Sequence, residues 1–181
     1  MTQDQTTKAR LIGAAAKLMG LHGVQAVSVE DIAAEAGFSK RTLYYHFKTK
    51  NELIAAWLQA RSLATSGAPA TEISDPRGAI LAVFDALDAY IESPQFRGCP
   101  FILTRVEVGS DAHPAYPVAL GHKERRRAWF VDLVTRIGLD EPVNKAEEIM
   151  VIWEGCWASS MIFRDQTPAK AARRLVERIL G

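Results

Sequence analysis

This 181-residue chain contains few cysteines and has almost no net charge: it has two cysteines and a formal charge of +1. Charged side chains such as Asp4 and Lys17 interrupt the first twenty residues, so they do not form a signal peptide. Together with the scarcity of cysteine, this favours a reducing, cytoplasmic location. The stretch closest to a membrane span, 149–163, is too short and contains Glu154, so we expect no membrane contact. The small net charge excludes a protein that binds polyanions through bulk charge.

Patterns typical of catalysis are also missing. The chain has no nucleophile paired with a base, no glycine-rich phosphate loop and no metal-ligand motif, so we expect neither an enzyme nor a cofactor. Four possible metal ligands lie near one another in the sequence, namely Glu107, Asp111, His113 and His122. Their spacing is not that of a known metal-binding motif, so solvated loop residues are the better interpretation. Strand alternation and internal repeats are absent, which predicts an all-α fold of about nine helices.

The segment 28–53 carries the signals for two short helices separated by a tight turn. Ser28 is a good N-cap for the first helix, and Asp31 is placed to complete a capping box. Gly37 ends that helix, because glycine enters the left-handed conformation without steric cost. Ser39 caps the second helix after a turn of about three residues, and this arrangement predicts a helix-turn-helix motif.

The second helix of this motif has an apolar face and a polar, basic and aromatic face. At 100° per residue, Leu43 and Phe47 point inward and Arg41 points outward. Arginine suits guanine edges, lysine suits phosphates, and threonine and tyrosine suit phosphates or thymine methyls. A solvated, slightly basic helix is the alternative. We expect the following residues to contact or position DNA: Ser28, Ser39, Lys40, Arg41, Thr42, Tyr44, Tyr45, His46 and Lys50.

Charge is distributed unevenly along the chain. Residues 1–50 contain seven basic and four acidic residues, whereas the remainder contains fifteen basic and seventeen acidic residues. The segment with the motif is therefore about +3 and the rest about −2. Local positive charge supports affinity for phosphates.

The run GFSKRTLYYHFKTKNEL, residues 37–53, resembles the recognition-helix signature of TetR-family transcriptional regulators. The preceding residues 9–37 resemble the N-terminal domain of the same family, and the detailed likeness covers about 6–53. The resemblance implies a homodimeric regulator with a DNA-binding domain over 1–49 and a helical ligand-binding and dimerisation domain over 50–181. It also implies a small-molecule effector without identifying it.

Helix signals continue through the rest of the chain. Pro76 and Pro142 each fit the first turn of a helix, and Ser66–Pro69 is typical of a break. The expected helices outside the motif cover approximately 5–22, 50–65, 76–92, 100–109, 115–137, a segment from 142, and 167 to the end of the chain.

Aromatic residues are spread over several of these expected helices. Ordinary core packing is one interpretation, and a ligand pocket between helices is the other. The family resemblance supports a pocket, and the segment 97–102 resembles a turn found in one branch of the family. On that basis we expect these residues to line it: Trp57, Phe84, Cys99, Phe101, Trp129, Trp153 and Trp157.

The two cysteines and one charged run allow other roles. Cys99 precedes a helix start that would lower a thiol pKa, so Cys99 and Cys156 are candidates for a redox sensor, although buried inert cysteines are commoner. The charged run 123–127 has the pattern of a solvated helix face, with a second nucleic-acid patch as the alternative.

The last two expected helices carry more apolar and small residues than one small domain can bury. A symmetric interface with a second copy of the chain is the natural outlet, and a dimer also reads two half-sites at once. We expect the interface to include Ile152, Ser159, Leu175 and Ile179.

Taken together, these features predict a sequence-specific transcriptional regulator that acts as a homodimer on a palindromic DNA operator. We expect a repressor that a small apolar or aromatic ligand releases from DNA. The alternative is a structural DNA-associated protein, of the nucleoid or of cell division, with the same DNA-binding domain and no response to a ligand.

Overall fold

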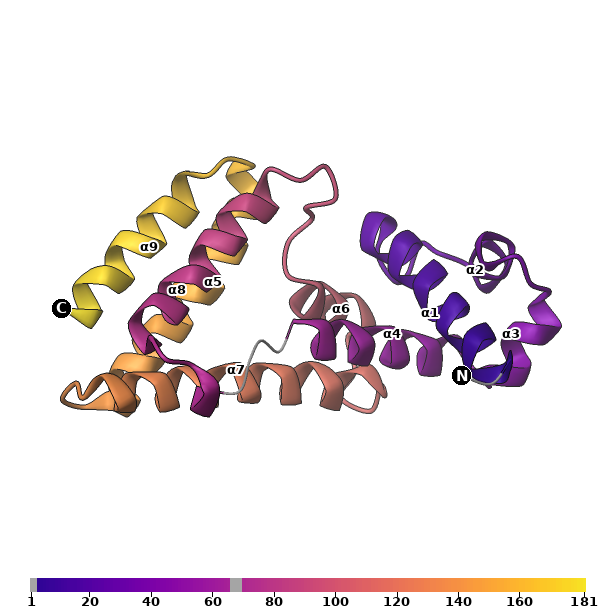
Figure 1. The fold of residues 1–181 in the computed structure, drawn as a ribbon. Helices are drawn as coiled ribbons and strands as arrows, with labels where there is room; N and C mark the ends of the chain where they lie inside the picture. The colour runs from indigo at the N-terminus through magenta and orange to yellow at the C-terminus, as the bar shows by residue number, and fades with distance from the viewer. Residues whose placement is uncertain (1–2, 66–69) are drawn as a thin grey trace. The chain divides into compact units, whose positions relative to one another are not determined.

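The computed structural model describes residues 3–65 and 70–181, and within these ranges it contains helices and loops without a β-strand (Figure 1). The expected all-α fold is confirmed. The elements are α1 Gln3–His22, α2 Val29–Ala36, α3 Lys40–His46, α4 Lys50–Ala64, a 3-10 helix at Ala70–Glu72, α5 Pro76–Ile91, α6 Pro100–Val108, α7 Ala115–Ile137, α8 Pro142–Phe163 and α9 Thr167–Leu180.

Most helix ends fall where the sequence places them. Both α5 and α8 begin at proline, whose missing N–H group costs nothing at a first helical position. Asp75 caps α5, because its carboxylate accepts from the Gly78 amide at 2.9 Å. The first helix begins two residues earlier than expected, at Gln3, and the 3-10 helix was not anticipated. The break expected at 66–69 lies outside the described residues.

The helices divide into two compact units. The first contains the described residues up to Thr65 together with Pro100–His122, which includes α1 to α4, α6 and the beginning of α7. The second contains the described residues from Ala70 to Cys99 together with Lys123–Gly181, which includes α5, the rest of α7, α8 and α9. These two units are defined by packing alone. The predicted boundary between a DNA-binding domain at 1–49 and a ligand-binding and dimerisation domain at 50–181 remains a prediction.

In the first unit, one apolar core holds the helix-turn-helix segment against α1 and α4. The helices α1, α2, α3 and α4 each contribute a side chain with no exposed surface, namely Leu11, Ile32, Leu43 and Leu53. A helix as short as α3, with seven residues, is marginal in isolation. Its position therefore depends on packing against its neighbours.

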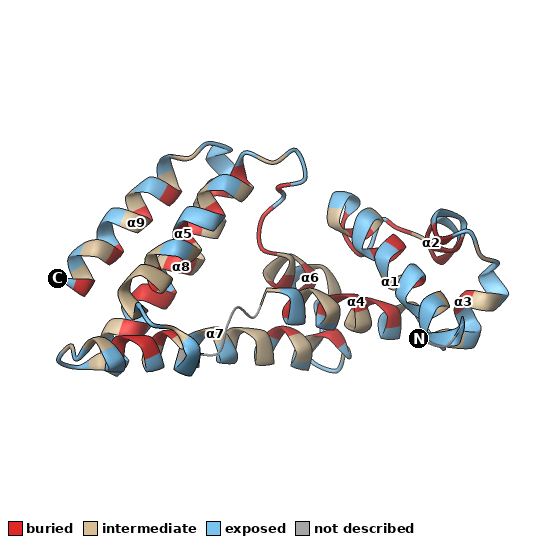
Figure 2. Cartoon of the chain, in the orientation of Figure 1, coloured by how far each residue is buried: buried red, intermediate tan, exposed pale blue. Residues whose placement is uncertain are grey.

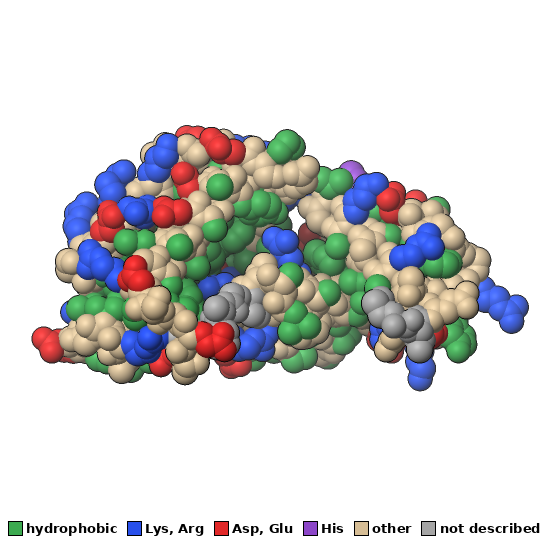
Figure 3. Space-filling view, viewed as in Figure 1, with side chains coloured by type: hydrophobic (Ala, Val, Ile, Leu, Met, Phe, Trp, Pro, Cys, Tyr) green, Lys and Arg blue, Asp and Glu red, His purple; other side chains and the backbone are tan. Residues whose placement is uncertain are grey.

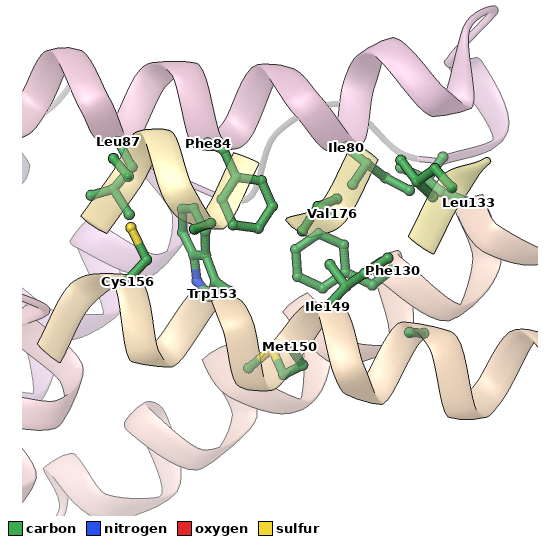
Figure 4. Packing of buried hydrophobic residues seen from close by; sticks show 14 of the residues in the cluster. Ile80, Phe84, Leu87, Phe130, Leu133, Ile149, Met150, Trp153, Cys156 and Val176 are labelled. Carbon is green, nitrogen blue, oxygen red and sulfur yellow. The ribbon is translucent and has the colours of Figure 1, made fainter. Parts of the chain in front are cut away.

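In the second unit, α5, α7, α8 and α9 each turn one apolar face inward (Figure 2). Phe84, Phe130 and Ile149 are fully buried at the centre of this core (Figure 4). Val176 of α9 packs into the same cluster, so the last helix is an integral part of the unit.

Candidate nucleic-acid interface and ligand region

The start of α2 is fixed by the capping box that the sequence predicts. The Ser28 hydroxyl accepts from the Asp31 amide at 3.1 Å, and the Asp31 carboxylate accepts from the Ser28 amide, also at 3.1 Å. The Ser28 hydroxyl also donates to the Asp31 carboxylate at 2.6 Å, and this hydrogen bond, together with the one from the Ser28 amide, lowers the pKa of the Asp31 carboxyl. Two amides that the helix itself cannot satisfy are therefore paired.

The turn between α2 and α3 is short because Gly37 adopts φ +72°, a left-handed conformation. The Phe38 amide then donates to the Ala33 carbonyl at 2.8 Å. Ser39 begins α3, with its hydroxyl accepting from the Thr42 amide at 3.1 Å. The predicted helix-turn-helix geometry is thus present in full.

The two faces of α3 are separated as predicted. Leu43 and Phe47 are buried, whereas Arg41 is exposed and Tyr45 is 79% exposed. Tyr44 is 41% exposed at the edge of the outer face. Lys and Arg side chains protrude at the end of the first unit that carries α3 (Figure 3). This helix therefore offers an accessible guanidinium and phenol to a partner.

Lys40 has a partner that sequence reasoning missed. Its ammonium forms an ion pair with Glu30 of α2, which raises the pKa of Lys40 and lowers the pKa of Glu30. Both groups are exposed, so solvent weakens the pair. The Lys40 ammonium also lies over the Tyr44 ring, 5.9 Å from its centroid.

His46 and Lys50 are less accessible than the sequence suggests. The His46 side chain is only 7% exposed, with Nδ1 3.6 Å from the Asp4 carboxylate. The Lys50 ammonium donates to the Gln25 carbonyl at 3.2 Å, and burial lowers the pKa of Lys50. At the start of α4, Thr49 and Glu52 already accept from nearby amides. A phosphate contact by either His46 or Lys50 stays a prediction.

Arg10 is a further residue that the sequence pattern did not single out. Its guanidinium donates to the Ala36 carbonyl at 2.8 Å and lies 4.5 Å from the centroid of the Phe38 ring. Arg10 thereby holds α1 against the turn between α2 and α3. Its signal in the sequence is weak, because a single arginine on an amphipathic helix is usually solvated.

The residues expected to line a ligand pocket are divided between the two units. Phe84, Trp153 and Trp157 lie in the second unit and are joined by ring contacts of 5.3 and 5.7 Å between centroids (Figure 4 shows Phe84 and Trp153). Tyr90 and Phe96 extend this aromatic cluster, with centroids 6.0 and 5.9 Å from Trp157. Sequence reasoning missed Phe96.

Polar groups border the aromatic cluster within the second unit. Lys123 donates to both carboxylate oxygens of Glu154, at 2.6 and 2.8 Å, and to the Cys99 sulfur at 3.3 Å. The Arg126 guanidinium lies 5.2 Å from the Trp129 ring centroid and 5.8 Å from that of Trp153. Burial lowers the pKa of Arg126. The run 123–127 is therefore not uniformly solvated, because it has partly buried members.

One buried carboxylate oxygen of the second unit, Asp88 Oδ1 of α5, has no hydrogen-bond partner among the described residues. Cys156 lies close enough to Asp88 and Ser160 for both to act on its thiol. A buried acceptor without a donor is costly, so this carboxylate oxygen is an unusual group in the core of the unit.

Trp57 and Phe101 belong to the first unit instead. Trp57 is 5% exposed, and the Phe101 ring stacks on the His122 imidazole with centroids 3.6 Å apart. His122 Nδ1 also hydrogen-bonds with the buried Ser62 hydroxyl at 3.0 Å. These residues join α4, α6 and the beginning of α7.

The two cysteines are both buried and free. Burial raises the pKa of the Cys156 thiol to about 11, so this thiol is protonated and weakly nucleophilic near neutral pH. Cys99 differs because a lysine ammonium lies beside its sulfur.

One face of α8 and α9 remains apolar and exposed in the single chain. Val151 and Ile162, three turns apart on the same side of α8, are 65% and 78% exposed, and Leu175 of α9 is 44% exposed. A shallow groove on this face is lined by Ile152 and Ile179, both expected at the dimer interface, together with Asn144, Glu147, Glu148 and Val151. Ser159 is half-buried.

Two negative findings hold for residues 3–65 and 70–181. Three or more His, Cys, Asp or Glu side chains are nowhere gathered as metal ligands would be. None of the helices has the length and apolarity to cross a bilayer.

A capped helix-turn-helix that presents arginine and tyrosine from its second helix defines a DNA-binding protein of the helix-turn-helix class. Residues 11–57 match the family model described as "Bacterial regulatory proteins, tetR family". A solved TetR-family transcriptional regulator from Streptomyces avermitilis is 32% identical, with 94% of this chain and 98% of that chain covered and a TM-score of 0.79. The chain belongs to the TetR family of DNA-binding transcriptional regulators.

Two curated relatives add detail. The HTH-type transcriptional regulator YjdC of Escherichia coli (strain K12) is 23% identical over 181 residues, covering 94% of this chain and 91% of that protein. The HTH-type transcriptional repressor KstR2 of Mycobacterium tuberculosis is 29% identical over 93 residues, covering 48% of this chain and 46% of that protein. The likeness to YjdC covers almost the whole chain, whereas that to KstR2 covers about half.

Proposed function

We propose that this protein is a transcriptional repressor that binds a palindromic operator as a homodimer and leaves it when a small apolar or aromatic ligand binds. The observation that carries the proposal is the exposed face of α3, with Arg41 and Tyr45 outward and Leu43 and Phe47 buried beneath. Repression is supported by KstR2, which is named a repressor and is similar over half of the chain.

Base reading rests on Arg41 in this proposal. Arginine donates two parallel hydrogen bonds to guanine O6 and N7 in the major groove, a contact worth about 1–3 kcal/mol of discrimination. Tyr45, Tyr44 and Thr42 are the candidates for phosphate and methyl contacts around it. Three other residues of the predicted set act indirectly in this proposal: Ser28 and Ser39 cap the helices, and Lys40 forms an ion pair with Glu30.

Dimerisation is supported by the apolar face of α8 and α9. Val151, Ile162 and Leu175 expose large side chains there, next to the groove lined by Ile152 and Ile179. Exposed apolar patches with a polar rim mark interaction sites. A second copy supplies the matching face through two-fold symmetry, and it presents a second α3 to the adjacent half-site about 34–36 Å along the DNA.

Ligand binding is supported by the aromatic cluster of the second unit. Phe84, Trp153 and Trp157 offer the apolar walls that small-molecule sites have. The partnerless oxygen of Asp88 favours a ligand that carries a hydrogen-bond donor. An aromatic molecule with one hydroxyl or amine group fits this combination.

The test is selection of DNA from a random-sequence duplex library with the wild-type protein. We expect enrichment of an inverted repeat. Arg41→Ala then weakens binding to the selected duplex about tenfold and relaxes the preference at one base pair in each half-site. Arg61, on α4 outside the motif, offers a matched control, since Arg61→Ala removes the same charge without changing base preference. Equal losses on all single-base variants of the duplex would make Arg41 a phosphate contact.

The competing function is a structural DNA-associated protein with the same first unit. Such a protein would bind duplexes without a preferred inverted repeat and would keep its affinity for DNA in the presence of any ligand of the second unit. The selection experiment and a ligand titration in the presence of DNA separate the two.

A further inference from the structure

The C-terminal end of α6 is hydrogen-bonded to the turn between α1 and α2, inside the first unit. The Gln25 amide donates to Oε2 of Glu107 at 3.0 Å, and the Gln25 side-chain amide donates to the Glu107 carbonyl at 3.0 Å. That carbonyl is one of the last in α6, which the helix itself leaves without a partner. Gln25 thus donates one hydrogen bond to the side-chain carboxylate of Glu107 and one to its backbone carbonyl.

The approach of Glu107 to this turn depends on Gly23. This glycine has φ +87°, and a Cβ atom built on it would lie 2.6 Å from Oε1 of Glu107 and 2.9 Å from Oε2. Only glycine combines that backbone conformation with that space. The close fit makes the contact between α6 and the turn a specific one.

Lys50 joins the same contact from the start of α4. Its ammonium donates to the carbonyl of Gln25 at 3.2 Å, and the Glu107 carboxylate is near enough to act on its charge. Burial lowers the pKa of Lys50, because the ammonium has lost part of its water here. One of the three N–H donors of Lys50 is therefore engaged with the turn.

We propose that Glu107 is a positioning residue for DNA binding, which holds the α1–α2 turn on the end of α6 and keeps Lys50 engaged there, away from the DNA phosphates. The inference rests on the proposed function, because it assumes that the first unit binds DNA. It assigns to α6 a direct hold on the α1–α2 turn and, through that turn, on Lys50 at the start of α4. Displacement of α6 would release the turn and Lys50 together.

The first test needs no DNA and uses the full chain. Amide hydrogen exchange at Gln25 is expected to be faster in Glu107→Ala, which removes the acceptor, and close to wild type in Glu107→Gln, whose amide oxygen still accepts. An unchanged exchange rate in Glu107→Ala would overturn the proposal, because the contact would then not restrain the turn.

The second test measures the salt dependence of binding to the duplex selected with the wild-type protein. In Glu107→Gln the charge that helps to hold Lys50 is gone, so the slope of log K against log salt steepens by about one unit. The steepening must disappear when Lys50 is also replaced: Glu107→Gln with Lys50→Met is expected to match Lys50→Met alone. Glu124→Gln, which removes an exposed charge of the second unit, is the matched control.

The outcomes are distinct. A steeper slope that persists in the Lys50→Met background would mean a general charge effect and would refute the role of Lys50. A wild-type slope in Glu107→Gln would refute it as well. Failure to select any duplex would contradict the proposed function, while the exchange experiment would still decide whether the contact exists.

Discussion

At the scale of single residues, much of the DNA-binding segment is organised by short polar side chains that cap helices. Ser28, Ser39 and Thr49 each accept from the amide three residues later, at 3.1 Å in every case. Replacing such a cap by alanine typically costs about 1 kcal/mol. Three successive caps at consecutive helix starts therefore determine where α2, α3 and α4 begin, independently of what the outer face contacts.

One residue-scale prediction concerns acid. The hydrogen bonds from Ser28 lower the pKa of Asp31 in the folded chain, whereas in the unfolded chain it lies near its ordinary value of about 3.9. The stabilisation is therefore fully present above that value and is lost as pH falls through the lower, folded value. Urea unfolding is expected to show Asp31→Asn less stable than wild type at pH 7, with a smaller difference at pH 3. A difference that is the same at both pH values would contradict this.

A second residue-scale prediction concerns Cys156. With a pKa of about 11 it is almost entirely protonated at pH 8, and its side chain is buried. In the Cys99→Ala variant, the remaining thiol should react with iodoacetamide only slowly in the native protein and at least tenfold faster in denaturant. Rapid reaction in the native state would restore Cys156 as a candidate redox sensor.

At the scale of elements, the exposed face of a helix indicates what kind of partner it can bind, and α3 differs in this respect from the pair α8 and α9. The outer face of α3 is polar, basic and aromatic, which suits DNA, whereas the outer face of α8 and α9 has large apolar side chains, which suits protein. Both helices of the pair also contribute to the core of their own unit through Ile149 and Val176. Their outer apolar residues are thus additional to what folding of the unit requires.

The element-scale prediction is that a charge on this face weakens the dimer. Val151 is 65% exposed and lines the groove on α8 and α9, so Val151→Glu should shift the protein toward monomer with little change in the stability of its own unit. Sedimentation velocity at several concentrations measures the shift. Val106 of α6 is 73% exposed and serves as the matched control, for which no shift is expected. Equal behaviour of the two variants would exclude this face as the interface.

At the scale of the whole molecule, regulation requires that ligand and DNA compete energetically. A ligand changes DNA affinity only through its different affinity for the two states, and typical coupling is about 1–3 kcal/mol. By reciprocity, operator DNA must weaken ligand binding by the same factor.

The prediction at this scale is a ligand affinity that depends on DNA. A ligand found by a thermal-shift screen should bind about 5–150-fold more weakly in the presence of the selected duplex. Trp157→Ala should reduce ligand affinity in both conditions, because Trp157 belongs to the aromatic cluster. Identical affinities with and without the duplex would leave a DNA-binding protein without a ligand response.

Most of the secondary structure was readable from the sequence because its signals are local. Serine caps, Gly37, and the prolines that open α5 and α8 act within a few residues of themselves, so they mark helix ends without knowledge of the fold. The inward positions of Leu43 and Phe47 followed from helical periodicity alone. The TetR family was also identifiable from residues 37–53.

The tertiary structure decided which polar side chains are free. Glu30 faces Lys40 across ten residues, Lys50 reaches Gln25 across twenty-five, and Glu107 reaches Gln25 across eighty-two. No local pattern specifies such partners, because they depend on how whole helices pack. The same holds for the aromatic residues: the sequence identified Phe84, Trp57 and Trp157 together, and packing placed Trp57 in one unit and the other two in the second. Interactions between residues close in the sequence therefore determined where the helices begin and end. Packing between residues far apart in the sequence determined which side chains remain exposed.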